Sequence, residues 1–264
     1  MMRFGFLGSG SEGNSLLIES RDGASVTRVL LDCGFGLRET ARRLERLGVT
    51  PDGLDAVLVT HEHGDHVGSA YAFAARHGLP VFTTHGTWLA TSHLRGADKA
   101  DVRVIGADYT FEIGNLQVLP YTVPHDAREP VQFVLSDGDA RLGVLTDAGM
   151  ETPYLVARLA GVDALVLECN HDREMLRNSV YPPSLKRRIG GDFGHLANEV
   201  AAAILARVAH SGLGRVVAAH LSQQNNTPAL ATGALAAALG TVADDILVAD
   251  QYEGLGWQAV KGSI

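Results

Sequence analysis

Short apolar runs separated by turn residues dominate the first part of the chain. Residues 2–7 form one such run, and residues 16–31 contain two more on either side of Arg21-Asp22-Gly23. The second of these is rich in β-branched and aliphatic residues. Apolar runs of this length, bounded by turn residues, are typical of buried strands. We therefore expect strand, turn, strand here, with no room for a helix of ten residues.

Helical spacing becomes common further along the chain. Between residues 103 and 146 the sequence is strand-rich, and Asp137-Gly138 is a hairpin signal. Pro182-Pro183 predicts a loop. Helices are expected at 37–47, 67–77, 152–159, 196–208 and 228–239, and strands at 56–59, 164–167, 215–219 and 246–249. Strands early and β/α alternation late favour an α/β (α+β) fold, with two mixed sheets packed face to face and helices outside.

The first turn contains a glycine pattern with two possible meanings. Gly8, Gly10 and Gly13 spell G-x-G-x-x-G, and Asp32 follows at the end of a later apolar run. In a dinucleotide-binding βαβ unit, such glycines must open a helix whose N-terminus holds the phosphates. A strand follows Gly13 instead, which excludes that unit. The glycines are predicted to form a turn between the first two strands.

Composition narrows the class of protein. The 264 residues are 46% hydrophobic, enough for one large core, and we predict a single domain over 1–264. We see no apolar run of membrane-spanning length, and the start lacks the long apolar region of a secretory signal, so we expect a cytoplasmic protein without a membrane partner. The net charge of −8 argues against bulk coating of nucleic acid but is compatible with an enzyme that contacts a few phosphates.

The strongest chemical signal is THEHGDH at residues 60–66. It brings His61, His63, Asp65 and His66 together, and such a cluster is costly unless a cation binds it. Nitrogen and oxygen donors of this kind suit zinc, manganese or iron. Three further donors, His125, Asp147 and His220, each follow a buried-type strand directly. Because a sheet presents its strand ends at one edge, we expect these donors to complete the site.

The order H-x-H-x-D-H, then His, Asp and His, resembles the metallo-β-lactamase superfamily over most of the chain. The resemblance implies a four-layer αββα sandwich with two divalent metal ions at one edge. It implies that His61, His63 and His125 hold one metal, that Asp65, His66 and His220 hold the other, and that Asp147 bridges them. Asp32 matches the superfamily's first acid, which supports the ligand loop without touching the metal.

Four finer motifs resemble the YycJ-like (WalJ-like) metallohydrolases of this superfamily. They are S-G-S-x-G-N-S at 9–15, E-C-N-H-D at 168–172, G-H-L-A-N-E at 194–199 and H-L-S-x-x-N-N at 220–226. Cys169 and Ala197 depart from the serine expected at each position. The separation of Asp147 from His220 is too short for the extra domain of β-CASP nucleases. The resemblance implies a dinuclear phosphodiesterase that degrades DNA as a 5′ to 3′ exonuclease.

The mechanism expected from this resemblance uses a hydroxide that bridges the two metals and attacks phosphorus. Asp65 would also orient that hydroxide, and His195 is the predicted general acid for the leaving oxygen. Residues predicted to contact the substrate are Ser9, Ser11, Asn14, His171, Arg187 and Arg188.

Two alternatives remain open. One is a small-molecule hydrolase of a cyclic phosphodiester or lactone, and the other is a regulatory protein that binds metal without turnover. The donor set accepts zinc or manganese, and iron as well, and the sequence carries no signal for an oligomeric state.

Overall fold

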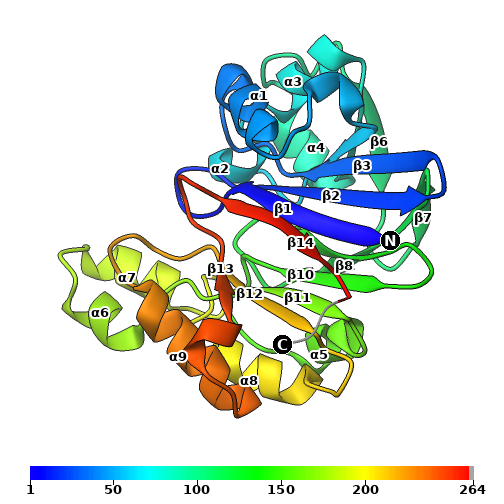
Figure 1. Cartoon of the computed structure of the whole chain (residues 1–264). Helices are drawn as coiled ribbons and strands as arrows, with labels where there is room; N and C mark the ends of the chain where they lie inside the picture. Colours follow the sequence, from blue (N-terminus) through cyan, green and yellow to red (C-terminus); the bar gives the residue numbers. More distant parts are fainter. Residues whose placement is uncertain (262–264) are drawn as a thin grey trace.

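The computed structural model describes residues 1–261, so the last three residues of the predicted domain lie outside the described range. Two sheets of seven strands each form its centre (Figure 1). The first sheet, in spatial order, is β14 (Leu255–Ala259), β1 (Met2–Gly8), β2 (Ser15–Asp22), β3 (Ser25–Leu31), β4 (Ala56–Leu58), β5 (Pro80–Thr84) and β6 (Asp101–Ile105). The second is β13 (Leu247–Val248), β12 (Arg215–Ala219), β11 (Ala164–Glu168), β10 (Arg141–Leu145), β9 (Val131–Ser136), β8 (Leu116–Thr122) and β7 (Phe111–Ile113).

Both sheets are mixed, and each has an antiparallel and a parallel part. In the first sheet, β14, β1, β2 and β3 pair antiparallel, and β3 to β6 pair parallel. In the second sheet, β7 to β10 pair antiparallel and β10 to β13 pair parallel. This arrangement fits the order of patterns along the chain, since hairpins need only short turns whereas parallel pairs need crossover connections.

Helices cover the outer face of each sheet (Figure 1). The first sheet is covered by α1 (Leu37–Arg46), α3 (Ala70–His77) and α4 (His85–Thr91), and the second by α5 (Pro153–Leu159), α8 (Asn198–Val208) and α9 (Pro228–Leu239). The short helices are α2 (Gly64–Val67), α6 (Arg173–Asn178) and α7 (Pro183–Ile189), with 3₁₀ turns η1 (Pro51–Gly53) and η2 (Ala243–Asp245). The predicted four-layer αββα sandwich of two mixed sheets is confirmed.

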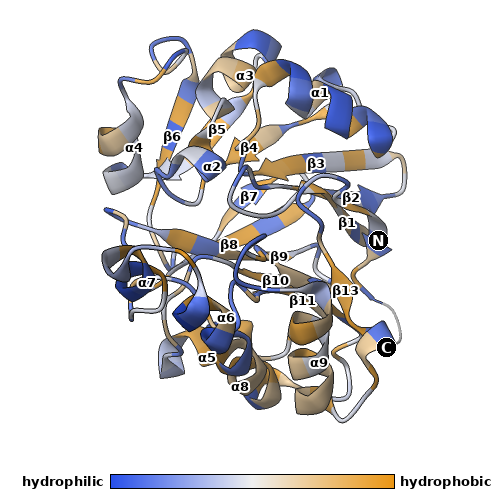
Figure 2. Cartoon of the chain, turned by 90° about the vertical axis from the view of Figure 1, so that its left-hand side faces the viewer, coloured by the Kyte–Doolittle hydropathy of each residue, from blue (hydrophilic) through white to orange (hydrophobic). Residues whose placement is uncertain are grey.

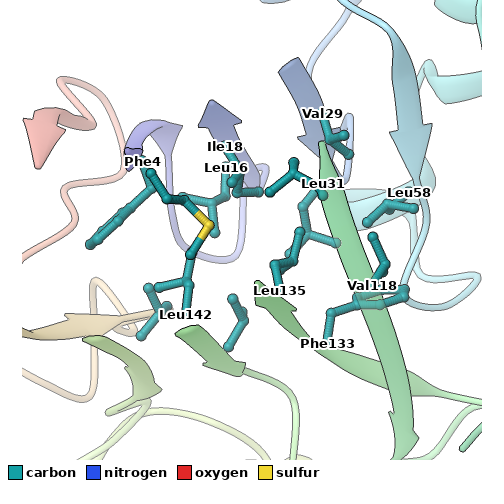
Figure 3. Close-up of a cluster of buried hydrophobic side chains, with 14 of the residues drawn as sticks. Phe4, Leu16, Ile18, Val29, Leu31, Leu58, Val118, Phe133, Leu135 and Leu142 are labelled. Carbon is teal, nitrogen blue, oxygen red and sulfur yellow. The ribbon is translucent and has the colours of Figure 1, made fainter. Parts of the chain in front are cut away.

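The largest apolar cluster lies between the two sheets (Figure 3). Phe4 and Ile18 from the first sheet meet Phe133 and Leu142 from the second, and all four are fully buried. Two further clusters join each sheet to its own helices. Burial of a side chain of this size contributes about 1.5–3 kcal/mol, so the sheets are held together by their inner faces.

Several element boundaries differ from the expectation. The helix expected at 67–77 is interrupted at Gly68, whose φ of +33° ends α2 before α3 begins at Ala70. The helix expected from 196 begins at Asn198. The loop predicted at Pro182-Pro183 is wrong, because Pro183 starts α7; proline is favoured at the first helical position, where the missing N–H costs nothing. The elements β5, α4, α6 and β14 were not predicted from the sequence.

Within residues 1–261, none of the helices combines the length and the apolar character that crossing a bilayer requires.

Candidate metal centre

Three residues of the predicted site follow the ends of strands in a left-handed backbone conformation. Asp32 after β3, Asp147 after β10 and His220 after β12 have φ values of 60°, 54° and 56°. Residues other than glycine rarely adopt this conformation, which costs of order 1–3 kcal/mol each and is found mainly at functional sites. Two of these residues, Asp147 and His220, are candidate metal donors and face each other, with Oδ1 to Nε2 at 3.6 Å. Strained ends of two strands of the second sheet therefore meet at one edge.

A first group of donors consists of three histidines. Nε2 of His61 lies 3.0 Å from Nδ1 of His63, and Nε2 of His125 lies 3.2 Å from the same atom. Burial and the neighbouring His66 hold the pKa of His61 well below its usual value, and burial lowers the pKa of His125. Metal coordination needs unprotonated nitrogens, so these three could hold one ion.

A second group consists of Asp65, His66 and His220. Oδ2 of Asp65 lies 3.5 Å from Nε2 of His66 and 3.5 Å from Nε2 of His220. Their candidate ligand atoms all lie within 4.8 Å of one another, so this group could hold a second ion.

Asp147 lies between the two groups. One of its oxygens, Oδ2, is 3.2 Å from Nε2 of His66, and the other, Oδ1, is 3.9 Å from Nε2 of His125. Burial alone would raise the pKa of Asp147, but the charges of His220 and His66 outweigh it and hold the pKa well below its usual value. An ionised carboxylate in this place can contact ions in both groups.

Two buried atoms at this centre have no hydrogen-bond partner among the described residues: Nε2 of His220 and Oδ2 of Asp147. A buried polar atom without a partner costs about 1–3 kcal/mol. A divalent cation among the donors would satisfy both atoms. Nitrogen and carboxylate donors suit zinc, manganese and iron, so the residues present fit a divalent metal.

Asp32 holds the ligand loop from behind. Its Oδ1 accepts a hydrogen bond from the backbone N–H of Thr60 at 2.9 Å, and its Oδ2 accepts one from Nδ1 of His66 at 2.8 Å. The contact orients the His66 ring so that Nε2 faces Asp65 and Asp147. This is the position that the predicted supporting role requires.

Glu168, for which no role was predicted, has a similar position behind two histidines. Its Oε1 accepts hydrogen bonds from Nδ1 of His195 at 2.8 Å and of His220 at 3.1 Å. Burial alone would raise the pKa of Glu168, but the interactions with His195 and His220 lower it to about 2. A signal was present in the sequence, because Glu168 is an acid at the end of the apolar strand β11.

The turn between β1 and β2 carries a further contact to the centre. Nδ2 of Asn14 lies 3.3 Å from Oδ2 of Asp65 and 3.1 Å from Nε2 of His66, and its Oδ1 accepts a hydrogen bond from the N–H of Gly10 at 2.8 Å. Ser9 is buried, and its Oγ accepts a hydrogen bond from the N–H of His220 at 2.9 Å. Asn14 therefore positions ligand residues, and Ser9 fixes the strand end.

Close packing explains the glycines of this turn. A Cβ at Gly8 would lie 2.3 Å from the guanidinium of Arg43, and one at Gly13 would lie 2.6 Å from the ring of Phe35. Arg43 stacks on the Phe35 ring at 3.9 Å from its centroid. The predicted turn is confirmed, and the residues after it form strand β2.

A cavity of about 390 Å³ opens over the donors. Its lining residues include Ser11, His63, Asp65, Arg188 and His195. Nε of Arg188 donates to Oδ2 of Asp126 at 2.6 Å, so this guanidinium is anchored at the rim.

Four of the six residues predicted to contact substrate do not line this cavity: Ser9 and Asn14, which contact the ligand residues, and Arg187 and His171. Arg187 is exposed on α7 but does not line the cavity. His171 is also absent from the lining, and it is buried, with an Nδ1 that has no hydrogen-bond partner among the described residues. Burial lowers the pKa of His171 to about 4, so this imidazole is neutral at physiological pH.

The fold and donor set define the class of protein. A family model described as a beta-lactamase superfamily domain matches residues 27–221, and the chain belongs to this superfamily. The chain is a hydrolase with the metallo-β-lactamase fold, and its histidine and aspartate clusters could bind divalent metal.

Two relatives and one solved structure make the comparison more specific. The chain is 35% identical over 233 residues to exodeoxyribonuclease YycJ of Bacillus anthracis, covering 87% of this chain and 86% of the relative. It is 32% identical over 236 residues to exodeoxyribonuclease WalJ of Streptococcus pneumoniae, covering 87% and 85%. The structure of Zn(2+)-bound PqqB from Methylobacterium extorquens has the same fold, with a TM-score of 0.74 at 22% identity, covering 97% of this chain and 99% of PqqB.

Proposed function

We propose that this protein is a two-metal phosphodiesterase that degrades DNA from a 5′ end. The observation that carries the proposal is that Asp147 lies between two groups of candidate metal donors. The hydrogen-bonded pair Glu168 and His195 lies beside them, and one open cavity lies over them. The names of the relatives, exodeoxyribonucleases at 32–35% identity over most of the chain, support DNA as the substrate.

One ion would be held by His61, His63 and His125, and the other by Asp65, His66 and His220, with Asp147 between them. Zinc and manganese are the expected metals, and iron also fits this donor set. Ions bound in such a pair supply a nucleophile from water at neutral pH and neutralise charge on the phosphoryl group. The carboxylate of Asp65, which Asn14 holds at 3.3 Å, faces the same cavity and can orient the attacking group.

His195 is placed to move the proton that the leaving oxygen needs. Its Nδ1 is hydrogen-bonded to the ionised Glu168, so Nε2, at the opposite edge of the ring, is the atom available to the substrate. An N–H at Nε2 is the group that would donate to the leaving oxygen. Glu168 acts through His195 and His220 and is therefore a positioning residue.

Arg188 supplies positive charge at the rim of the cavity. Its guanidinium keeps a fixed direction through Asp126 and retains N–H groups that can contact a phosphate oxygen. Ser11, an exposed residue in the lining of the same cavity, offers a hydroxyl. The predicted substrate contacts of Ser11 and Arg188 remain part of the proposal.

The test uses metal-stripped protein reloaded with manganese or zinc. DNA labelled at the 5′ or the 3′ end distinguishes the direction of degradation, and a bis-aryl phosphodiester reports on the metal centre alone. We expect 5′-terminal nucleotides to be released first from DNA. Asp147→Asn should abolish both reactions. His77→Gln, which changes a histidine on α3 that pairs with Asp52, should leave both unchanged.

His195→Gln tests the proton-transfer role separately. A general acid typically contributes 10²–10⁴-fold, so turnover of DNA should fall by about that factor while metal content is unchanged. The pH profile should lose its alkaline limb. An unchanged rate and pH profile would remove His195 from the mechanism.

Other outcomes would replace the proposal. Activity confined to a cyclic phosphodiester or a lactone would make the protein a small-molecule hydrolase. Two bound metals without turnover on any of these substrates would favour a regulatory binding protein.

A further inference from the structure

Two adjoining hollows lie on the helical side of the first sheet, next to the ligand loop. One, of about 650 Å³, is bounded by the start of α1, by Gly68 and Ser69, and by Leu94 and Arg95. The other, of about 590 Å³, lies between α3 and the segment 92–99. The hollows share lining residues, so they form one continuous groove, which we call the α1–α3 groove. Figure 2 shows α1 and α3 above α2, the helix that carries two of the metal donors.

Four exposed cations border the α1–α3 groove: Arg38, Arg76, Arg95 and Lys99. None of them forms an ion pair or a side-chain hydrogen bond with another residue of the described chain. Most cations elsewhere in the described chain are neutralised; Arg42 and Arg43, for example, both pair with Glu39.

Acidic residues do not neutralise the groove. Glu39 lines the groove, but hydrogen bonds from Arg42 and Arg43 lower its pKa to about 2. Its carboxylate is therefore already paired with these two arginines. Asp98 is the remaining carboxylate among the lining residues. Unpaired like charges repel one another, and this protein carries a net charge of −8. A positive groove on an acidic protein therefore indicates a local polyanion site.

We propose that the α1–α3 groove binds the phosphodiester backbone of the DNA strand that extends beyond the metal cavity. The inference rests on the proposed function. The groove begins at Gly68, two residues after the donor His66, and only the single turn of α2 separates it from the metal centre. A helix is about 10–12 Å across, which corresponds to roughly three nucleotides of a strand stacked as in a duplex, at ~3.4 Å each.

The arrangement of the cations selects a long polyanion as the occupant. They come from three segments, the start of α1, the end of α3 and the segment after α4, and all four are exposed. An enclosed phosphate site would instead hold buried donors converging on one point. Leu37 and Leu94 on the floor of the groove supply apolar contacts for sugars and bases.

The cavity and the groove would therefore have separate roles in the reaction. The cavity acts on the terminal phosphodiester, and the groove holds the rest of the strand. Loss of the groove should weaken binding of long DNA without changing turnover of a substrate too short to reach it.

The experiment compares Arg95→Gln/Lys99→Gln with the matched control Arg207→Gln/Lys261→Gln. Both double variants remove two positive charges, but Arg207 lies on α8 and Lys261 follows β14, away from the groove. Binding of a labelled 30-nucleotide single strand is measured by fluorescence anisotropy from 50 to 200 mM salt. Turnover of the bis-aryl phosphodiester and degradation of the same strand are measured in parallel.

We expect the groove variant to bind the strand about 10- to 30-fold more weakly at 0.1 M salt. The slope of log K against log salt should become shallower by ~1.4, because each phosphate contact on a single strand contributes about 0.7. Its turnover of the small diester should equal that of the wild type, and the control variant should bind normally.

Three results have separate meanings. Equal affinity and salt slope in the groove variant and the control would overturn the groove assignment. A second result is that millimolar inorganic phosphate displaces DNA from the wild type but not from the groove variant. That result would assign the cations to a free phosphate, and it would also overturn the groove assignment. Hydrolysis of the small diester with no degradation of DNA by the wild type would refute the proposed function, while the anisotropy data would still decide the groove.

Discussion

Glu19 offers a quantitative test of how the first sheet is stabilised. On β2 it lies opposite Arg3 of β1 and Arg28 of β3. Its fully buried side chain accepts hydrogen bonds from Arg3 at 2.8 Å, from Arg21 at 2.6 Å and from Arg28 at 2.7 Å. Burial alone would raise the pKa of Glu19, but the three arginines outweigh it and lower the pKa to about 2.

The magnitude follows from this shift. A pKa lowered from 4.5 to about 2 corresponds to ~3.4 kcal/mol. The arginine side chains keep 22–47% of their surface in water, and screening of such pairs reduces the contribution to about 2 kcal/mol. Because the folded pKa is depressed, this stability is present above pH 4.5 and is lost as the pH falls towards 2.

The assay unfolds the wild type and Glu19→Gln with urea in the presence of chelator. Circular dichroism monitors the unfolding. At pH 7 the variant should unfold with about 2 kcal/mol less free energy, and the difference should approach zero by about pH 2. Glu112→Gln, an exposed change on β7, should stay within ~0.5 kcal/mol. A difference that is the same at pH 3 and pH 7 would refute the electrostatic explanation.

Three further outcomes follow from the site. Gly34→Ala would place a Cβ 1.9 Å from the carbonyl oxygen of Asp65. The substitution should lower the free energy of unfolding by about 1–3 kcal/mol in thermal denaturation, and it should lower the metal content. Gly36→Ala, whose Cβ would meet nothing within 4 Å, should change neither. Asp32→Asn should weaken metal binding about 10- to 100-fold in a chelator competition, and its control Asp52→Asn, an exposed acid beside His77, should bind normally; equal affinities would remove Asp32 from its supporting role. Chelation should stop hydrolysis and lower the melting temperature, since metal at a hundredfold excess over Kd stabilises by ~2.7 kcal/mol; an unchanged melting temperature would argue against binding across the two sheets.

The convergence of the candidate donors was predictable because each follows a strand. His125, Asp147 and His220 each stand directly after an apolar run, and strand ends of one sheet meet at one edge. The same rule covers Glu168, an acid that ends its strand. It was not assigned a role because its contacts are to Nδ1 atoms of histidines 27 and 52 positions away in the chain.

Other features depend on tertiary contacts that no local pattern carries. Gly34 and Gly68 are required by the approach of one loop to another, which spacing does not reveal. Arg188 and Asp126 are 62 positions apart, so their pairing appears only in three dimensions. The helix α7 was missed because two prolines in succession were interpreted as a loop, although proline also begins helices.

The distribution of donors over both sheets sets an order for biosynthesis. The first four donors lie within residues 61–66, but His125, Asp147 and His220 belong to the second half of the sandwich. A growing chain thus exposes a cluster of histidines long before the strands that enclose it have been made. During that interval the cluster is an incomplete chelator that any available transition metal can reach. Coordination of metal by the full set of predicted donors would therefore have to wait until β12 has joined its sheet.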